Sequence, residues 1–282
     1  QKKEFKRLGV EGDWENPYLT MSNQAEAQIV RELGKFLLDE SLYKGSRPVL
    51  WSVVEKTALA DAEVEYEEHT SNTIYVKFKV TRSNLDELIG SDIIIWTTTP
   101  WTIPGNRALA YGKELEYLFI KIQEVNETSL AKIGDKIIIA KTLCENVLNE
   151  IGVIKFEISK SFFGEELKGT ECEHPFKSMD YDFTIFALEA DFVNTEQGTG
   201  IVHIAPGHGD DDYKLGIKNN IDIIQTVEDD GKYNSYAKGF VGEHVFKVDL
   251  KIADKLKELN KLLHLGTLRH SYPHSWRSKA PL

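Results

Sequence analysis

The stretch Ile-Ile-Ile-Trp-Thr-Thr-Thr-Pro-Trp-Thr-Ile-Pro-Gly-Asn, residues 93–106, decides how this sequence is interpreted. Its β-branched and aromatic residues predict a strand over 93–96. Pro100 and Pro104 cannot donate to a central ladder, so the strand must end there. The backbone groups that such a break leaves free, beside three adjacent threonine hydroxyls, can bind a small ligand. A structural role, with threonines in a strand and tryptophans in the core, is the alternative that the attached Pro-Trp-Thr-x-Pro-x-Asn pattern disfavours.

Further strands and two helices are expected outward from this stretch. Residues 73–80 alternate strictly between apolar and polar, which predicts a half-buried strand. Residues 22–40 and 249–263 carry apolar residues at helical spacing. The other expected strands are 117–122, 137–140, 153–158 and 200–204. The pattern predicts an α+β fold, with a β-barrel-like mixed core flanked by helical N- and C-terminal arms.

Three segments are expected along the chain. Residues 1–60 form a helical arm, residues 61–247 form the central domain, and residues 248–282 form a helical return arm. The two arms resemble the ends of an insertion, because neither is large enough to form a domain alone. The chain begins with Gln1 and no signal peptide, which favours an excised piece of a longer protein.

Composition excludes several classes of protein. The 282 residues are 41% apolar, as in soluble globular proteins, and no apolar run approaches the roughly 20 residues of a membrane-spanning helix. Two cysteines are too few for a disulfide scaffold or a four-cysteine zinc site. A reducing, cytoplasmic location is therefore expected.

The charge distribution limits nucleic-acid binding. The net charge is −11, and residues 61–250 alone carry 18 basic and 34 acidic residues. Such an acidic middle argues against a broad phosphate-binding surface. Any nucleic acid must be held locally or by another part of a larger protein.

A second motif is Gly-Thr-Gly-Ile-Val-His-Ile-Ala-Pro-Gly-His-Gly-Asp-Asp-Asp-Tyr, residues 198–213. The three aspartates could open a helix, where their charge complements the helix dipole. They could also form a metal site with His203 and His208, although the spacing matches no standard ligand motif. In a third interpretation, one aspartate receives an ammonium group and a histidine forms a pocket wall.

A third segment is His-Ser-Tyr-Pro-His-Ser-Trp-Arg-Ser-Lys, residues 270–279. It could be an extended surface segment with a buried Trp276. Its aromatic and cationic residues could instead make a local nucleic-acid contact.

Together these motifs resemble the editing insertion, connective peptide 1, of the isoleucyl-tRNA synthetase family. The strings at 96–106 and 198–213 both match, and residues 7–21, 58–66 and 270–282 extend the likeness over nearly the whole chain. Related enzymes for valine and leucine have Thr-Thr-Arg-Pro where this chain has Thr-Thr-Thr-Pro at 97–100, which favours the isoleucine family.

The chain departs from that family at two places. Many members have a Trp-Cys-x-x-Cys pair where this chain has Trp51-Ser52-Val53-Val54-Glu55, and a Cys-Trp-Arg-Cys pair where it has Ser275-Trp276-Arg277-Ser278. Because serine is a poor zinc ligand, we expect no zinc. The ATP-site motifs His-x-Gly-His and Lys-Met-Ser-Lys-Ser are absent, so ATP and magnesium belong to a catalytic domain outside this chain, and we expect no aminoacylation by it.

The resemblance implies an aminoacyl-tRNA ester hydrolase that needs no cofactor. Its substrate would be valine wrongly attached to isoleucine tRNA, with valyl-adenylate as a further candidate, and isoleucine would be excluded by size. The implied partners are the valine-carrying acceptor end of that tRNA and the rest of the synthetase. No membrane partner is expected, and the chain should be a monomer.

The resemblance also implies roles for individual residues. Asp212 would pair with the substrate ammonium, and Thr102 and His203 would set the pocket size. The walls of the pocket would be Trp96 and Trp101. The ester and the attacking water would be oriented by Thr97, Thr98 and Thr99, and Asn106 would hold the pocket or the terminal adenosine. No residue stands out as a general base, so a ribose hydroxyl of the adenosine is expected to help position the water.

Two other functions remain open at this point. One is a metal-dependent hydrolase that uses His203, His208 and the aspartates 210–212. The other is a non-catalytic module that binds the tRNA acceptor end. Loss of activity in a chelator, with recovery in zinc or manganese, would favour the metal-dependent hydrolase. Turnover of valyl-tRNA by the isolated chain would exclude the non-catalytic module.

Overall fold

The computed structural model describes all residues, 1–282, and the chain divides into two units, Gln1–Ser46 and Arg47–Leu282. Their boundary lies at residue 46, whereas the sequence placed the end of the first arm at residue 60. No helix in the chain combines the length and the apolar character that crossing a membrane requires.

The first unit contains two helices, α1 (Lys2–Arg7) and α2 (Asn23–Leu38). The expected helix is confirmed, with Ser22 as its N-cap, because the Ser22 side chain accepts a hydrogen bond from the Ala25 N–H. Neither helix has a buried residue, and the large apolar side chains of α2 are exposed.

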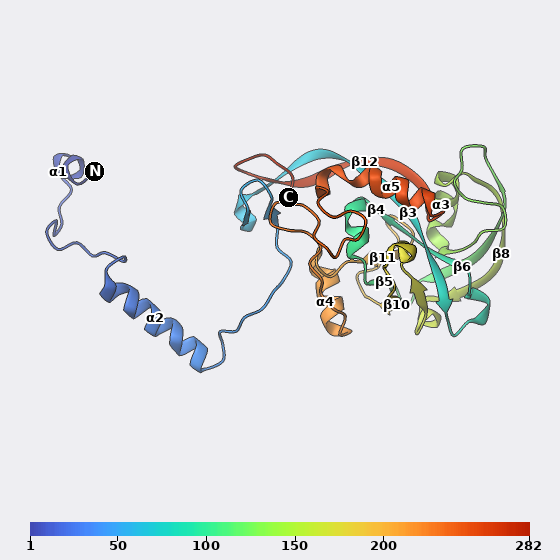
Figure 1. Cartoon of the computed structure of the whole chain (residues 1–282), viewed down its shortest axis with the longest axis horizontal. Coiled ribbons are helices and arrows are strands. Elements are labelled where there is room, and N and C mark those ends of the chain that lie inside the picture. Colours follow the sequence, from blue (N-terminus) through green and yellow to red (C-terminus); the bar gives the residue numbers. More distant parts are fainter. The chain divides into compact units, whose positions relative to one another are not determined.

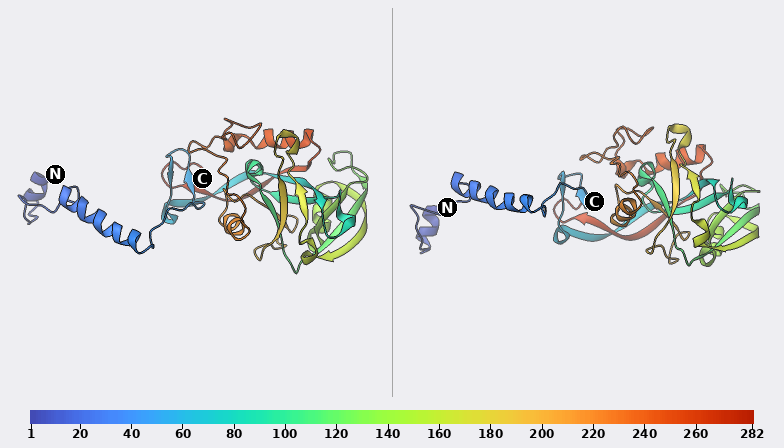
Figure 2. Two further views of the ribbon diagram at one scale, coloured as in Figure 1. Left: turned by 60° about the horizontal axis from the view of Figure 1, so that its bottom comes forward. Right: turned by 90° about the horizontal axis from the view of Figure 1, so that it is seen from below.

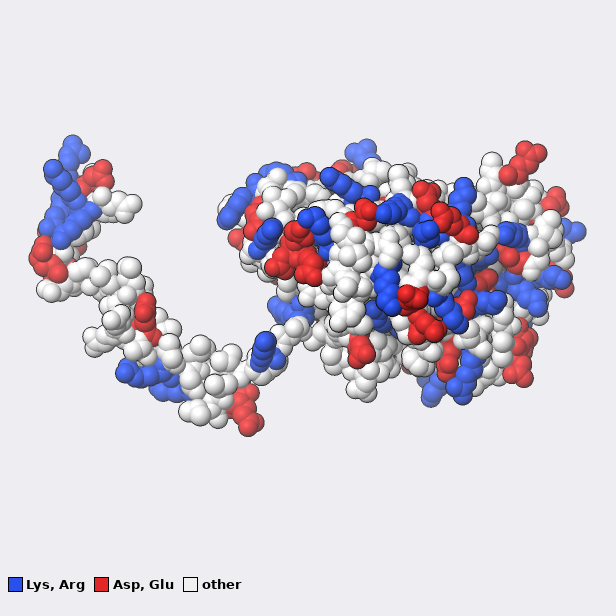
Figure 3. All heavy atoms as spheres, viewed as in Figure 1, with Lys and Arg blue, Asp and Glu red and all other residues white.

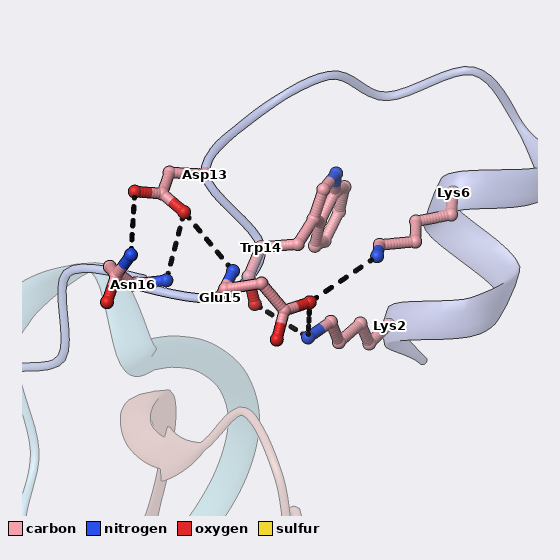
Figure 4. A network of polar contacts seen from close by, with 6 residues as sticks. All are labelled: Lys2, Lys6, Asp13, Trp14, Glu15 and Asn16. Carbon is pink, nitrogen blue, oxygen red and sulfur yellow. Dashed lines mark hydrogen bonds and ion pairs between the residues drawn. The ribbon is translucent and has the colours of Figure 1, made fainter.

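A small polar network follows α1 (Figure 4). The Asp13 carboxylate accepts hydrogen bonds from the backbone N–H groups of Glu15 and Asn16, at 3.2 and 3.0 Å. Lys2 Nζ donates to the Trp14 carbonyl at 2.6 Å and to Glu15 at 3.2 Å. These contacts tie the loop back onto α1.

The second unit contains a large mixed sheet, a two-stranded hairpin and three α-helices (Figure 1). The hairpin is β1 (Trp51–Ser52) and β2 (Thr57–Ala58). The sheet strands are β3 (Val64–Arg82), β4 (Asp92–Thr97), β5 (Ala108–Tyr111), β6 (Glu116–Val125), β7 (Lys136–Ala140), β8 (Val153–Phe163), β9 (Glu171–Glu173), β10 (Thr184–Glu189), β11 (Ile201–Ile204) and β12 (Leu262–Ser275). The α-helices are α3 (Cys144–Glu150), α4 (Asp210–Lys218) and α5 (Asp249–Glu258). Short 3-10 helices are η1 (Asp61–Glu63), η2 (Asp86–Leu88), η3 (Pro100–Gly105), η4 (Lys141–Leu143), η5 (Gly164–Leu167), η6 (Lys177–Met179) and η7 (Val245–Lys247).

The long strand β3 connects the parts of the sheet. The order is β11-β5-β10-β9-β3-β4-β7-β6-β8, and β12 also pairs with β3. Only the β4–β7 and β5–β10 pairs are parallel. β3 pairs with β12 from Val64 to Val76 and then with β4 and β9, so β3 and β12 run side by side as a long ribbon (Figure 2).

The α+β class is confirmed, but the sheet does not close into a barrel, since no ladder joins β11 to β8. The sheet curls so that the start of β11 lies beside the start of β6 and the end of β7. The Tyr117 hydroxyl donates to the Gly200 carbonyl at 2.6 Å, and the Ala140 N–H donates to the Thr199 carbonyl at 2.8 Å. A Cβ at Gly200, where φ is +76°, would lie 2.3 Å from the Ala140 Cβ. Glycine permits this close crossing.

The strict alternation predicted for residues 73–80 is wrong. Tyr75 and Lys77, expected on the solvent face, are buried. The Tyr75 hydroxyl donates to Glu150 at 2.9 Å, and Lys77 Nζ pairs with Asp135 at 3.0 Å. Both faces of β3 are therefore covered in this region, and polar partners compensate the buried groups.

The predicted helical return arm also differs from the structure. α5 ends at Glu258, and Asn260 has a left-handed backbone with φ of +56°. From Leu262 to Ser275 the chain forms β12. Residues 248–282 therefore complete the central sheet with a strand.

Candidate functional site

The threonine stretch forms a hydrogen-bonded turn where β4 ends. Thr97 Oγ1 accepts from the Thr99 N–H at 3.1 Å and lies 3.2 Å from Thr99 Oγ1. Thr102, in η3, donates its hydroxyl to the Thr99 carbonyl at 2.9 Å. Pro100 at the start of η3 ends the strand as predicted. The Thr98 side chain is half-buried and makes no hydrogen bond.

His203 of β11 joins this turn from 101 residues away. Its Nε2 lies 2.7 Å from Thr102 Oγ1, and its Nδ1 lies 3.1 Å from Asn106 Nδ2. The amide nitrogen of Asn106 can only donate, so Nδ1 accepts and Nε2 carries the proton. Donors and acceptors then form one directed chain from Asn106 through His203 and Thr102 to the Thr99 carbonyl.

Burial makes His203 a neutral group. Removal from water lowers its pKa to about 3, and the nearby His208 adds to this shift. Both ring nitrogens are engaged, so this side chain is fixed in orientation and is no proton carrier near pH 7. Asn106 Nδ2 also donates to the Ala108 carbonyl at 2.9 Å, which leaves Asn106 Oδ1 buried without a partner.

Asp212 lies in the first turn of α4. Its Oδ2 accepts from the Ala205 N–H at 2.7 Å, which holds the carboxylate against the residue that follows β11. Burial raises the pKa of Asp212 to about 6, with the Ala205 hydrogen bond opposing the shift and Asp211 adding to it. A half-buried carboxylate with no cationic partner is suited to receive an ammonium group.

The three neighbouring aspartates differ in their surroundings. Asp210 is exposed and pairs with Lys214 at 2.5 Å, and Asp211 is exposed. Only Asp212 is directed into the fold. All three lie in the first turn of α4, so the interpretation in which the aspartates open a helix is confirmed, and an ammonium role for one of them stays a prediction.

The two tryptophans lie on different elements. Trp101 is half-buried in η3, where its ring meets His208 edge-on with centroids 5.0 Å apart, and its carbonyl accepts from the Tyr233 hydroxyl. Trp96 is half-buried in β4, and a Cβ at Gly198 would lie 3.4 Å from its ring. The second motif therefore contacts both tryptophans.

The structure joins Thr97, Thr99, Thr102, Asn106 and His203 in one network. Asp212 connects to the same loop through Ala205, whereas Trp96 and Thr98 make no hydrogen bond to the network.

Sequence reasoning missed several supporting residues. A Cβ at Gly105 would lie 2.9 Å from His208 Cδ2, so glycine allows η3 to approach that ring. His208 Nε2 lies 2.9 Å from Thr226 Oγ1. Tyr233 supports η3 from 132 residues away. The Pro-Gly pair was a signal for Gly105, but nothing in the sequence indicated Tyr233 or Thr226.

The metal interpretation finds no support in the geometry. No group of three or more histidine, cysteine or carboxylate side chains in the chain is placed to hold an ion. His203 is committed to Thr102 and Asn106, and His208 to Thr226.

A separate cleft of about 720 Å³ is lined by Arg107, Tyr181, Phe183 and Lys238 among others, and by none of the predicted site residues. The buried Arg107 guanidinium lies 4.4 Å from the centroid of the Phe183 ring. Its Nη1 donates to the Asn106 carbonyl at 2.5 Å and to the Pro104 carbonyl at 3.4 Å. Arg107 thus holds the end of η3 from the side of this cleft.

The segment 270–279 forms the end of β12 and the following turn. Trp276 is 45% exposed, so the alternative with a buried Trp276 is wrong on that point. The Arg277 guanidinium lies 5.7 Å from the Trp276 ring centroid. A local nucleic-acid contact by this exposed aromatic and cationic pair stays a prediction.

Comparisons with known proteins agree with this architecture. The family described as "tRNA synthetases class I (I, L, M and V)" matches residues 1–166. The chain is 56% identical over 281 residues to the isoleucine--tRNA ligase of Pelagibacter ubique (strain HTCC1062), and 44% identical over 295 residues to that of Gluconobacter oxydans (strain 621H). Each alignment covers 100% of this chain and 31% of the relative, so the chain spans about a third of their length.

A solved structure described as "The crystal structure of GlLeuRS-CP1" has the same fold. It superposes with a TM-score of 0.51 at 15% identity, and covers 69% of this chain and 98% of that one. With the family matched over more than half of its length, the chain belongs to the class I tRNA synthetases (I, L, M and V), as a segment similar to part of the isoleucine--tRNA ligases and with the fold of a connective-peptide domain.

Proposed function

We propose that this chain is the editing part of an isoleucine--tRNA ligase and hydrolyses the ester between valine and isoleucine tRNA. Valyl-adenylate is a second candidate substrate. The observation that carries the proposal is the directed hydrogen-bond chain from Asn106 through His203 and Thr102 to Thr99. The half-buried Asp212 carboxylate is held by the Ala205 N–H, two residues after His203. The names of the relatives support the isoleucine system.

The chemical need for such a site is general. Valine lacks one methylene of isoleucine, and a pocket gains only about 1–3 kcal/mol of binding free energy from such a group. This is the general range for one methylene, and discrimination between isoleucine and valine is its standard example. A second site must therefore admit valine and exclude isoleucine by steric clash.

The size filter is assigned to Thr102 and His203. Their 2.7 Å contact and the Asn106 contact fix both side chains, so the filter is rigid. A rigid wall rejects an added methylene better than a mobile one, because it cannot move aside. Trp96 and Trp101 are assigned as outer walls.

Substrate orientation is assigned to Asp212 and the threonine turn. The Asp212 carboxylate would bind the amino group of the aminoacyl ester. The hydroxyls of Thr97, Thr98 and Thr99 would orient the ester and the attacking water. Asn106, whose Oδ1 has no partner, would either hold the pocket in shape or bind the terminal adenosine. The ester is already activated, so positioning and dipoles suffice without a strong base.

The tRNA would be held mainly by the rest of the synthetase. Figure 3 shows acidic and basic side chains interspersed over the visible face of the second unit, with no broad basic surface there. We expect the chain alone, as a monomer, to bind the acceptor end weakly, with a steep dependence on salt.

The test is deacylation of valyl-tRNA(Ile) under single-turnover conditions at low salt. The chain should be used in excess, and the same variants should be placed in a full-length synthetase that carries this segment. Asp212→Asn should lose valyl-tRNA hydrolysis while keeping the circular dichroism of the wild type. The matched control is Asp211→Asn, an exposed carboxylate on the same turn.

The competing functions predict other results. Near-normal hydrolysis by Asp212→Asn would refute the ammonium role. Loss of hydrolysis in a chelator, with recovery in zinc or manganese, would favour a metal-dependent hydrolase. Binding with no turnover, even in the full-length enzyme, would favour a non-catalytic module.

A further inference from the structure

Two turns of the same construction lie at the base of the β3–β12 ribbon. One is Ser52–Lys56, and the other is Ser275–Lys279. In each turn the first serine accepts a hydrogen bond from the backbone N–H three residues later, at 3.2 Å for Glu55 and 3.4 Å for Ser278. Each turn ends in a lysine with left-handed backbone, with φ of +54° and +57°.

The carboxylate of Glu55 joins these turns. It accepts hydrogen bonds from the Ser52 hydroxyl within its own turn and from the Ser275 hydroxyl, at 3.1 Å, in the other. The Ser278 and Ser275 hydroxyls hold the pKa of Glu55 below its ordinary value, against an opposing effect of burial. Ser52 and Ser275 are fully buried. We call Ser52, Glu55, Ser275 and Ser278 the Glu55 cluster.

The spacing of the cluster is that of a metal site, but its donors are not. Two pairs of ligands, each separated by two residues and carried on two turns, are typical of tetrahedral zinc sites built from cysteines. Three neutral serine hydroxyls and one carboxylate do not fit zinc, whose structural sites consist of thiolates and neutral imidazoles. The Ser52 and Ser275 hydroxyls also direct their protons towards the Glu55 carboxylate, so they do not present a shared set of lone pairs.

We propose that the Glu55 carboxylate takes the place of a metal ion as the centre that joins the two turns. In a zinc site a central cation attracts four anionic sulfurs. In the Glu55 cluster a central anion attracts hydroxyl donors, so the charges are reversed and the connection is kept by charge-assisted hydrogen bonds. The base of the domain is therefore independent of zinc.

This connection joins the β1–β2 hairpin to the turn after β12. The Trp276 N–H donates to the Glu63 carbonyl at 3.0 Å, and the Trp51 indole donates to the Asp229 carbonyl at 2.9 Å. The chain enters the second unit and leaves β12 at this place. The Glu55 cluster thus fixes the two chain segments that lead into and out of the ribbon.

The first test uses the whole chain and measures bound zinc and the thermal midpoint. The wild type, purified without chelator, should contain far less than one zinc per chain, and EDTA should not change its midpoint. Glu55→Ala should lower the midpoint by about 2–4 °C or more, and Glu55→Gln by less. Glu67→Ala, which removes an exposed glutamate of β3 with no ion pair, is the control and should leave the midpoint unchanged.

The second test converts the cluster into a metal site. A chain with S52C, E55C, S275C and S278C should bind one cobalt(II) with the absorption of tetrahedral thiolate coordination, and EDTA should then lower its midpoint. Zinc near one per wild-type chain, with a fall in midpoint on its removal, would overturn the proposal. So would equal midpoints for Glu55→Ala and Glu67→Ala. These two measurements decide the question even if the four-cysteine chain does not fold, and a folded four-cysteine chain without tetrahedral cobalt would also count against it.

Discussion

His203 Nε2 lies 2.7 Å from Thr102 Oγ1, although the two residues are 101 positions apart in the chain. The Thr102 hydroxyl donates to the Thr99 carbonyl, so it must accept from His203. The two side chains therefore form one wall, and a change in either one alters the position of both.

The first prediction concerns amino acid discrimination. Thr102→Ala removes a methyl and the acceptor of His203, so the proposed pocket becomes larger and less rigid. Hydrolysis of correctly charged isoleucyl-tRNA should rise by roughly tenfold or more, since one methylene is worth about 1–3 kcal/mol. The measurement is single-turnover deacylation of isoleucyl-tRNA and valyl-tRNA. Thr267→Ala, an exposed residue of β12, is the control, and unchanged discrimination by Thr102→Ala would place the size filter elsewhere.

The second prediction concerns stability in acid. Burial lowers the pKa of His174 and His203 to about 3 and that of His208 to about 4, so below pH 6.5 the unfolded chain binds protons that the folded chain does not. The contribution of these histidines to the free energy of unfolding is therefore complete above pH 6.5 and is lost as the pH falls below that value. Burial raises the pKa of Asp212 and Asp249 to about 6. Between pH 3.8 and 6 the folded chain therefore binds protons at these two groups that the unfolded chain does not, and their contribution to the free energy of unfolding increases on acidification.

Near pH 5, three histidines lower the free energy of unfolding on acidification, and two aspartates raise it. The unfolded chain binds about one more proton, and the free energy of unfolding should fall by about 1 kcal/mol per pH unit on acidification. Urea unfolding between pH 7 and 4.5 measures this slope. Asp212→Asn removes an opposing group and should steepen it, whereas a free energy that stays level or increases towards pH 5 would contradict the account.

The third prediction concerns the approach of η3 to His208. Gly105→Ala places a Cβ 2.9 Å from His208 Cδ2, which forces the ring or the turn to move. The loss in free energy of unfolding should be about 1–3 kcal/mol, as for other overpacked sites. Urea unfolding gives the value. Gly34→Ala in α2, where a Cβ meets nothing within 4 Å, should cause no loss, and equal results for both variants would show that the contact has no consequence.

The fourth prediction concerns the curl of the sheet. The buried Tyr117 hydroxyl accepts from the Gly112 N–H at 3.0 Å and donates to the Gly200 carbonyl at 2.6 Å. Tyr117→Phe leaves both backbone groups without this partner and should cost about 1–3 kcal/mol. Denaturant unfolding measures this loss, with Tyr66→Phe at an exposed position of β3 as the control. A loss no larger than that of the control would mean that the backbone groups find other partners.

Local signals in the sequence predicted local structure well. Ser22 and the helical spacing after it gave α2, and Pro100 gave the end of β4. The α5 prediction overran, because Leu262 and Leu263 fit both an apolar helix face and a strand beside β3. Periodicity alone does not distinguish these environments.

Long-range contacts were beyond sequence patterns. The alternation in β3 failed because Tyr75 and Lys77 are buried and find their polar partners, Glu150 and Asp135, on distant segments. The resemblance placed the threonine stretch and the His203 motif in one site, but it did not give the order of donors and acceptors between them. That order follows only from the distances among Asn106, His203 and Thr102.

The antiparallel pairing of β3 with β12 has a mechanical consequence. Val64 and Ser275 are partners at one end of the ribbon, so tension applied between the two flanking segments would open the ladder one rung at a time, from that end. Peeling of this kind needs far less force than sliding strands past each other, because each rung bears the whole load in turn. The hydroxyl–carboxylate contacts of Glu55 with Ser275 would then be the first to yield, while the strands around Thr97 and His203 would remain paired.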